Sequence, residues 1–221
     1  AFVTQVLVGR LQAKALVCGY NYHFGQKATG DAATLGRLCE KYALHLEVVP
    51  EVTAGKPADG PAAFPPLAVS ASRIRRLIEA GELRTANLLL GRPYAICEQV
   101  VYGKQLGRTI GIPTINQFPP AQAVLPAHGV YASRTLVAGR FYPSITNVGV
   151  RPTVDEDNIV NFETHIHGID ARLYGQCIRV ELYDRIRGEK KFSSLAAMKE
   201  QIEKDIAVSE TIFHAYVKEN G

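Results

Sequence analysis

Hydrophobic and polar positions in the first part of the chain repeat with two periods, one typical of helices and one typical of short buried strands. Residues 1–11 show the helical period, and the apolar side of this helix is formed by Phe2, Val6, Leu7 and Leu11. Residues 13–19 and 44–50 predict strands, and residues 31–42 predict a helix with Asp31 as its N-cap. Such alternation is typical of βα units on a parallel sheet.

The pattern changes twice before the middle of the chain. Residues 53–66 are rich in glycine, proline and alanine, which predicts an exposed loop. Two helices are expected next, over residues 72–80 and 82–90, and each is followed by a glycine that ends it. The Arg92–Pro93 step then interrupts the helical pattern, so we predict a domain boundary at this step.

After this boundary the periodicity is that of strands. Short β-rich runs separated by turn residues cover residues 95–102, 129–139, 140–150, 158–168 and 177–186. Ala138-Gly139 predicts a tight hairpin, and the series of strands predicts a small barrel. A helix expected over residues 193–218, capped by Ser193 or Ser194, would close this barrel. Its apolar stripe is formed by Leu195, Met198, Ile202, Ile206 and Phe213.

Composition and charge narrow the class of protein. The 221 residues are 47% hydrophobic with a net charge of +4, and the basic residues are scattered, so we expect a real core and no nucleic-acid partner. No apolar run is long enough for a membrane span. The four cysteines lack C-x-x-C spacing, which favours buried free thiols in a reducing cytoplasm over a zinc site. Because the chain opens at Ala1 within a helical pattern, we expect a further segment upstream.

The densest group of candidate functional residues lies in residues 103–116, GKQLGRTIGIPTIN. Its glycines, which permit close approach to a ligand, are Gly103, Gly107 and Gly111. Lys104 and Arg108 add positive charge to a loop whose N–H groups can bind an anion. Thr114 and Asn116 offer hard oxygen ligands that suit Mg²⁺. The loop therefore predicts a nucleotide site, although it is neither a Walker A nor a Rossmann motif and composition alone also fits a plain turn.

Glu163 is the candidate general base. Phosphoryl transfer needs a group that accepts the proton of the attacking hydroxyl, and a carboxylate near Thr114 and Asn116 can do so. Glu163, His165 and His167 share one face of a predicted strand. The residues alone leave two alternatives open, a solvated glutamate and a Glu/His/His metal triad.

Four motifs in order, PTIN, LPAHGVYA, FETHI and IRGEKKF, resemble the riboflavin kinase domain of bifunctional riboflavin kinase/FAD synthetases. The resemblance implies a six-stranded β-barrel with a C-terminal helix over residues 93–221, and ATP- and Mg²⁺-dependent conversion of riboflavin to FMN. It implies that Glu163 is the base, and that Thr114 and Asn116 hold Mg²⁺ and the ATP phosphates. Arg187 falls on an arginine near the flavin, although Gly188 replaces the family's proline.

Residues 1–92 resemble part of the FMN adenylyltransferase domain of the same proteins. GYNYHFG and SASRIR match two of its motifs, and the residues that the resemblance places at the flavin and nucleotide phosphates are Asn21, Phe24, Gly25, Ser70, Ser72, Arg73 and Arg75. Ala71 replaces a serine of the second motif. The family's G-x-F-D-G-x-H-x-G-H motif does not occur in this sequence. We therefore expect an incomplete Rossmann-like nucleotidyltransferase domain whose adenylylation of FMN to FAD is absent or very weak.

Two other functional classes remain as hypotheses. A non-catalytic flavin- or nucleotide-binding module would bind flavin without forming product. A nucleic-acid-binding barrel would show salt-dependent binding to oligonucleotides, but the sequence offers no stacking platform for it. The favoured partners are the small molecules riboflavin, ATP and FMN, with no prediction of oligomeric state.

Overall fold

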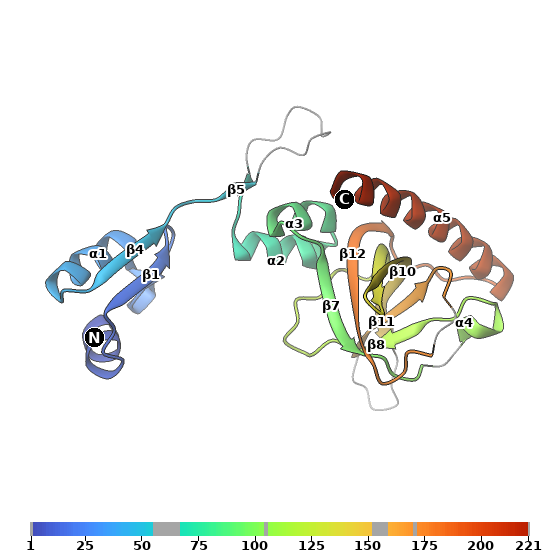
Figure 1. Cartoon of the computed structure of the whole chain (residues 1–221), viewed down its shortest axis with the longest axis horizontal. Coiled ribbons are helices and arrows are strands. Elements are labelled where there is room, and N and C mark those ends of the chain that lie inside the picture. Colours follow the sequence, from blue (N-terminus) through green and yellow to red (C-terminus); the bar gives the residue numbers. More distant parts are fainter. Residues whose placement is uncertain (1, 55–66, 104–105, 152–158, 170–171, 221) are drawn as a thin grey trace. The chain divides into compact units, whose positions relative to one another are not determined.

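The protein forms two compact units, which divide between Val69 and Ser70. The computed structural model describes residues 2–54, 67–103, 106–151, 159–169 and 172–220. Figure 1 shows the elements of each unit.

The first unit contains a two-stranded parallel sheet covered by one helix. β1 (Ala15–Gly19) pairs with β4 (His45–Val49), and α1 (Ala32–Lys41) connects them as predicted. Asp31 caps α1, because its side chain accepts a hydrogen bond of 2.7 Å from the Thr34 backbone N–H. The short elements of this unit are η2 (Gln26–Ala28), the paired strands β2 (His23–Phe24) and β3 (Gly30–Asp31), and the paired strands β5 (Thr53–Ala54) and β6 (Leu67–Ala68).

The first helix differs from its predicted form. η1 (Phe2–Arg10) is a π-helix, in which each turn holds an additional residue, so apolar positions spaced for an α-helix no longer share one side. Val3 is the buried residue, whereas Phe2 and Leu11 are 40% and 66% exposed. The loop predicted over residues 53–66 is also shorter at its start, where Thr53–Ala54 forms β5, and residues 55–66 lie outside the described residues.

The second unit is a six-stranded antiparallel sheet in the order β7-β12-β9-β10-β11-β8. The strands are β7 (Tyr94–Gln99), β8 (Ile115–Gln117), β9 (Gly129–Val137), β10 (Arg140–Arg151), β11 (Ile159–Ile166) and β12 (Cys177–Arg187). Ala138 and Gly139 form the predicted β9–β10 hairpin with φ angles of 49° and 80°, the positive values that a primed turn requires.

A narrow seam joins the two end strands and closes the sheet into the predicted barrel. Val101, just after β7, forms a single bridge with Asn116 of β8, and its N–H donates to the Asn116 carbonyl at 2.9 Å. The fully buried Gln117 side chain donates to the carbonyls of Glu98 and Ile178 at 2.7 and 2.8 Å. One side chain thus supplies hydrogen bonds that the short β8 ladder does not make.

The inside of the barrel combines an apolar cluster with a chain of hydroxyl groups. Tyr131, Val148 and Phe162 are fully buried members of the apolar cluster. The hydroxyl groups of β9, β10 and β11 bond one another at 2.8 to 2.9 Å, through Ser133, Thr135, Ser144, Thr146 and Thr164. Because each of these buried hydroxyl groups has a partner, the polar row avoids the cost of an unsatisfied group.

Two helices that precede the barrel strands pack on its core. α2 (Ala71–Ala80) and α3 (Leu83–Leu90) end at Gly81 and Gly91, whose φ angles of 79° and 66° explain the predicted glycine stops. These helices contribute Ile78, Leu83 and Ala86 to the core cluster of the barrel. By packing, the second unit therefore begins at Ser70 rather than at the step after Arg92.

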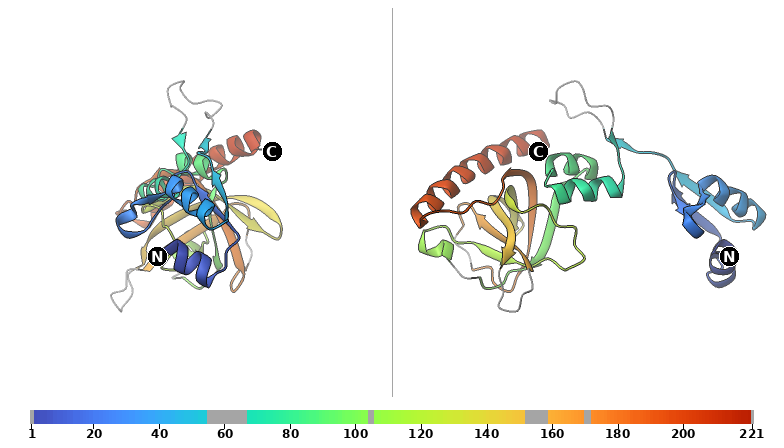
Figure 2. Two further views of the ribbon diagram at one scale, coloured as in Figure 1. Left: turned by 90° about the vertical axis from the view of Figure 1, so that its left-hand side faces the viewer. Right: turned by 180° about the vertical axis from the view of Figure 1, so that it is seen from behind.

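The C-terminal helix α5 (Leu195–Asn220) lies against β9, β10 and β12 on the outside of the barrel (Figures 1 and 2). Ser194 is its cap, as one of two predicted candidates, and accepts a hydrogen bond from the Ala197 N–H at 3.1 Å. Leu195 of the predicted apolar stripe is instead 57% exposed. The most deeply buried residues of the helix are polar, Asp205 at 2% and Ser209 at 0% exposure, because both bond to the barrel.

Candidate functional site

Three neighbouring strands form the floor of the candidate site on one face of the barrel sheet. In the strand register, Glu163 of β11 lies opposite Asn116 of β8 on one side and opposite Asn147 of β10 on the other. Cross-strand partners on one face have their Cβ atoms about 5 Å apart. The sheet therefore brings together Glu163 and Asn116, which are far apart in sequence.

An asparagine that the sequence analysis did not select connects these two residues. Asn161 lies two residues before Glu163 on the same face of β11, and it is 3% exposed. Its Nδ2 donates to the Asn116 Oδ1 at 2.9 Å and to the Glu163 Oε1 at 3.0 Å. The two-residue spacing from Glu163 was the signal that would have identified it.

The glycine-rich loop lies over this floor. A Cβ atom on Gly103 would lie 2.6 Å from the Cγ of Asn116, so only glycine fits there without displacing the amide. α4 (Leu106–Thr109) follows, and a turn in which the Ile112 N–H donates to the Gly107 carbonyl at 2.8 Å leads to Thr114. Lys104 lies outside the described residues.

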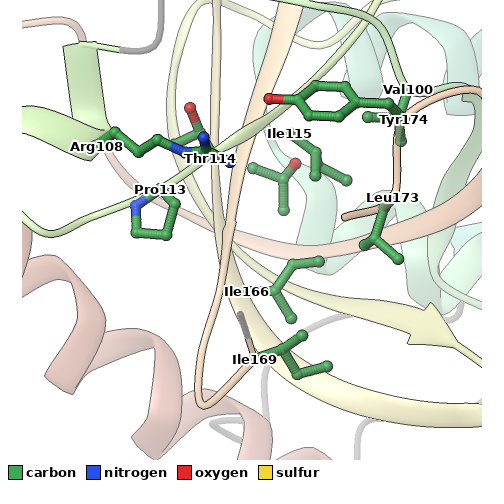
Figure 3. A pocket seen from close by; sticks show the side chains of 10 residues that line it. Val100, Arg108, Pro113, Thr114, Ile115, Ile166, Ile169, Leu173 and Tyr174 are labelled. Atoms are coloured by element: carbon green, nitrogen blue, oxygen red, sulfur yellow. The ribbon is translucent and has the colours of Figure 1, made fainter. Parts of the chain in front are cut away.

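A hollow opens beside Thr114, between this loop and the segment that follows β11 (Figure 3). Its apolar wall is formed by Val100, Ile115, Ile166, Ile169, Leu173 and Tyr174. Arg108, Pro113 and Thr114 line the other side in Figure 3. An adjoining hollow shares Arg108 and adds the cationic Arg172. An apolar wall beside two guanidinium groups suits a ligand with an apolar ring and a strongly anionic part.

Two histidines lie at the end of β11, His165 within the strand and His167 directly after it. His165 Nδ1 lies 2.8 Å from the Pro113 carbonyl oxygen, which ties β11 to the loop. Burial, and then the neighbouring His165, lower the pKa of His167 to about 4 despite Glu210 at 3.3 Å. Within the described residues no group of three His, Cys, Asp or Glu side chains could hold a metal, so the Glu/His/His triad is not formed.

Arg187 makes its main contacts with α5. Its guanidinium donates to both carboxylate oxygens of Asp205, with Nη2–Oδ2 at 2.7 Å, and Gln201 donates to the same carboxylate at 3.0 Å. The guanidinium of Arg187 also lies 5.7 Å from the Phe192 ring centre. A contact between Arg187 and flavin stays a prediction.

The residues assigned to adenylyltransferase motifs fall in different units. Asn21, Phe24 and Gly25 belong to the first unit, where Phe24 stacks on Tyr22 with ring centres 5.9 Å apart. The SASRIR motif belongs to the second unit, in which Ser70 caps α2 by accepting a 3.3 Å hydrogen bond from the Arg73 N–H. Ser72, Arg73 and Arg75 lie in the first turns of that helix.

The four cysteines are all free, as expected, but only Cys39 is buried. Cys97 and Cys177 are exposed on β7 and β12, because each points away from the barrel interior at an alternating strand position. Every helix of the described residues is too short or too polar to cross a membrane.

Comparison with known protein families agrees with this fold. The profile of the riboflavin kinase family matches residues 90–213, and that of the FAD synthetase family matches residues 1–58. Since the first match covers more than half of the sequence, the chain belongs to the riboflavin kinase family.

Individual relatives give the same result. The chain is 33% identical over 215 residues to a bifunctional riboflavin kinase/FMN adenylyltransferase of Haemophilus influenzae, covering 97% of this chain and 66% of that protein. It is 32% identical to the protein of that name from Bacillus subtilis, covering 92% and 61%. The chain thus spans less than two thirds of these relatives. A crystal structure described as a macrolide-efflux protein from Streptococcus pneumoniae is similar with a TM-score of 0.74 at 30% identity, covering 95% of this chain and 64% of that one.

Proposed function

We propose that this protein is a riboflavin kinase that transfers the γ-phosphoryl group of ATP to the 5′-hydroxyl of riboflavin. The observation that carries the proposal is the position of Glu163, an exposed carboxylate opposite Asn116 in the strand register. The family to which the chain belongs supports the choice of substrates.

In the proposed reaction Glu163 accepts the proton of the riboflavin hydroxyl. The hydroxyl oxygen then forms a bond to the γ-phosphorus, while the bond from that phosphorus to the bridging oxygen breaks and ADP leaves. Asn161 holds one oxygen of the Glu163 carboxylate at 3.0 Å, so the carboxylate has a defined direction before substrate binds. A positioned base of this kind contributes about 10²- to 10⁴-fold to rate.

The nucleotide would lie in the hollow, with its phosphates at the glycine-rich loop. Arg108 lines the hollow and supplies positive charge, while the N–H groups of the loop add further donors. Gly111 has open space where a side chain would lie, whereas the space at Gly103 and Gly107 is filled by Asn116 and the Ile112 carbonyl. Lys104 is proposed as a second cation. The apolar wall suits the base of the nucleotide.

The residues present fit a magnesium ion. Thr114 and Asn116 offer a hydroxyl and an amide oxygen, and Mg²⁺ is commonly held by few protein ligands together with waters and substrate phosphates. When bound, Mg²⁺ would neutralise phosphate charge.

Arg187 is the residue proposed to lie on the flavin side of the site. With its fork bound to Asp205 and Phe192 near its guanidinium, Arg187 is proposed to contact the flavin ring through its planar guanidinium. We further propose that this chain by itself makes little or no FAD, because it contains no G-x-F-D-G-x-H-x-G-H motif. Four free cysteines, two of them exposed, support a reducing compartment such as the cytoplasm.

The test is to incubate the protein with riboflavin, ATP and Mg²⁺ and to separate the flavins by chromatography. We expect FMN without FAD, and no FMN when Mg²⁺ is chelated. Glu163→Gln should lower turnover at least about 100-fold. The matched control is Glu203→Gln on α5, whose carboxylate is exposed and pairs only loosely with Lys199 at 4.0 Å, and it should keep full turnover.

Three outcomes would contradict parts of the proposal. Wild-type turnover in Glu163→Gln would exclude this glutamate as the base. FAD formed by the purified chain would show that the missing motif is dispensable. Bound flavin without any FMN, from folded protein, would instead identify a non-catalytic binding module.

A further inference from the structure

Asn161 occupies a position where an asparagine is costly unless it serves the site. Asparagine is disfavoured in strands, and this one is 3% exposed in the middle of β11. Its Oδ1 is buried and has no hydrogen-bond partner among the described residues. An unsatisfied buried polar atom lowers stability, so the residue does not act as an efficient packing element.

The nitrogen of the same amide makes two hydrogen bonds, one to Asn116 and one to Glu163. The two hydrogens of Nδ2 are directed to Asn116 Oδ1 at 2.9 Å and to Glu163 Oε1 at 3.0 Å. The reverse amide orientation would place an oxygen against the carboxylate. The charge of Glu163 therefore fixes the orientation of Asn161, and Asn161 in turn directs the amide oxygen of Asn116.

We propose that Asn161 is a positioning residue for phosphoryl transfer, whose amide sets the directions of the Glu163 carboxylate and the Asn116 amide together. This inference rests on the proposed riboflavin kinase activity. One rigid, buried donor group then orders the base and the phosphate-side amide relative to each other before either substrate arrives. Misplacement of a reacting group by about 1 Å costs about 100-fold in rate, which sets the size of the expected effect.

The test is a double-mutant cycle on the full chain with riboflavin, ATP and Mg²⁺. Asn161→Leu has a similar volume and removes both donors, so we expect kcat to fall about 10- to 100-fold with the riboflavin KM within about threefold. In the Glu163→Gln background the same change should lower the residual rate by a smaller factor, because the carboxylate is gone and only the direction of the Asn116 amide is still affected.

A matched control separates positioning from loss of structure. Thr146→Val also removes a buried hydrogen-bonding group from the barrel, on β10, but from the interior face rather than the site face. We expect it to lower the thermal midpoint while leaving kcat within about twofold. If Asn161→Leu does not fold, Asn161→Asp is the second variant, because it keeps the shape of the side chain and replaces the amide NH2 with an oxygen. Its effect on kcat should likewise not add to that of Glu163→Gln.

The outcomes distinguish this inference from the proposed function. If Glu163→Gln abolishes turnover but the Asn161 variants keep wild-type kcat, the positioning role is wrong and the kinase proposal stands. Equal losses in both backgrounds would also overturn it, since a purely structural residue acts independently of Glu163. Full turnover in Glu163→Gln would contradict the base assignment on which both rest.

Discussion

Gly103 shows how a single residue without a side chain shapes the site. It lies so close to Asn116 that a methyl group in its place would overlap the amide, and the nearest side-chain atoms include both the nitrogen and the oxygen of that amide. Glycine is therefore required at this position because there is no room for a side chain above Asn116. Its φ angle is not in the left-handed region, so backbone strain is not the reason.

Gly103→Ala should displace the Asn116 amide and lower kcat/KM for ATP about 10-fold or more, since the amide is a proposed phosphate-side ligand. Steady-state kinetics with varied ATP at saturating riboflavin would measure this. Gly188→Ala is the control, because its Cβ would meet its nearest neighbour at an ordinary 3.6 Å, and it should have wild-type kinetics. Equal kinetics for both variants would show that the loop shifts freely to accept the methyl group.

At this scale the sequence points more readily to the residues proposed to carry chemistry than to those that support them. Glu163 and Asn116 were selected from residue type and motif, and the strand register places them opposite each other. Asn161 and Asp205 were not selected. Both are polar residues that residue type alone assigns to the surface, and only the folded strands and α5 reveal their buried partners.

Among the elements, α5 depends on a buried ion pair rather than on an apolar stripe alone. Arg187 of β12 and Asp205 of α5 form a forked pair in which the carboxylate side chain is 3% exposed. Such pairs hold an element in register, and removal of one partner leaves the other charge buried. The pair therefore fixes where along the barrel the helix lies.

Arg187→Met should lower the free energy of unfolding of the barrel by about 3 to 5 kcal/mol, because Asp205 keeps its buried charge without a partner. Urea unfolding followed by the tyrosine fluorescence of the barrel would measure the change. Lys204→Met is the control on the same helix, where the pair with Glu200 is exposed, and it should not change the midpoint measurably. Wild-type stability of Arg187→Met would mean that packing alone holds α5.

The elements themselves were largely predictable from periodicity. Five strands of the barrel, the β9–β10 hairpin and α1 to α3 lie where alternation, caps and glycine stops predict them, whereas β8 was not among the predicted runs. η1 was not predictable as a π-helix, because its apolar positions follow the spacing of an α-helix. The buried polar residues of α5 were also not predictable, because a hydrophobic pattern does not reveal which polar residues become buried.

For the whole molecule, the position of the boundary between units has a direct consequence for fragments. α2 and α3 belong by packing to the barrel, and Asn87 of α3 donates to the Leu182 carbonyl at 2.9 Å and accepts from the Tyr94 N–H at 2.7 Å. A change in periodicity after Arg92 marks the end of helices, but it contains no information about which unit they pack on.

A fragment of residues 70–221 should fold and keep riboflavin phosphorylation within about threefold of the full chain. A fragment of residues 93–221 loses the helices that cover Ile96 and Leu182, and its thermal midpoint should be at least about 10 °C lower, consistent with a loss of a few kcal/mol. Circular dichroism melting of both fragments would measure this. Equal midpoints would instead place the structural boundary at residue 92, where the strand pattern begins.

The bridge that closes the barrel includes a residue of the proposed active site. Asn116 is both the residue whose backbone completes the single bridge to Val101 and a residue whose side chain faces Glu163. When this seam opens, β8 keeps its pairing with β11, but Asn116 loses the bridge that fixes its backbone on the other side. Heat should therefore lower activity before the far-ultraviolet signal of the protein changes.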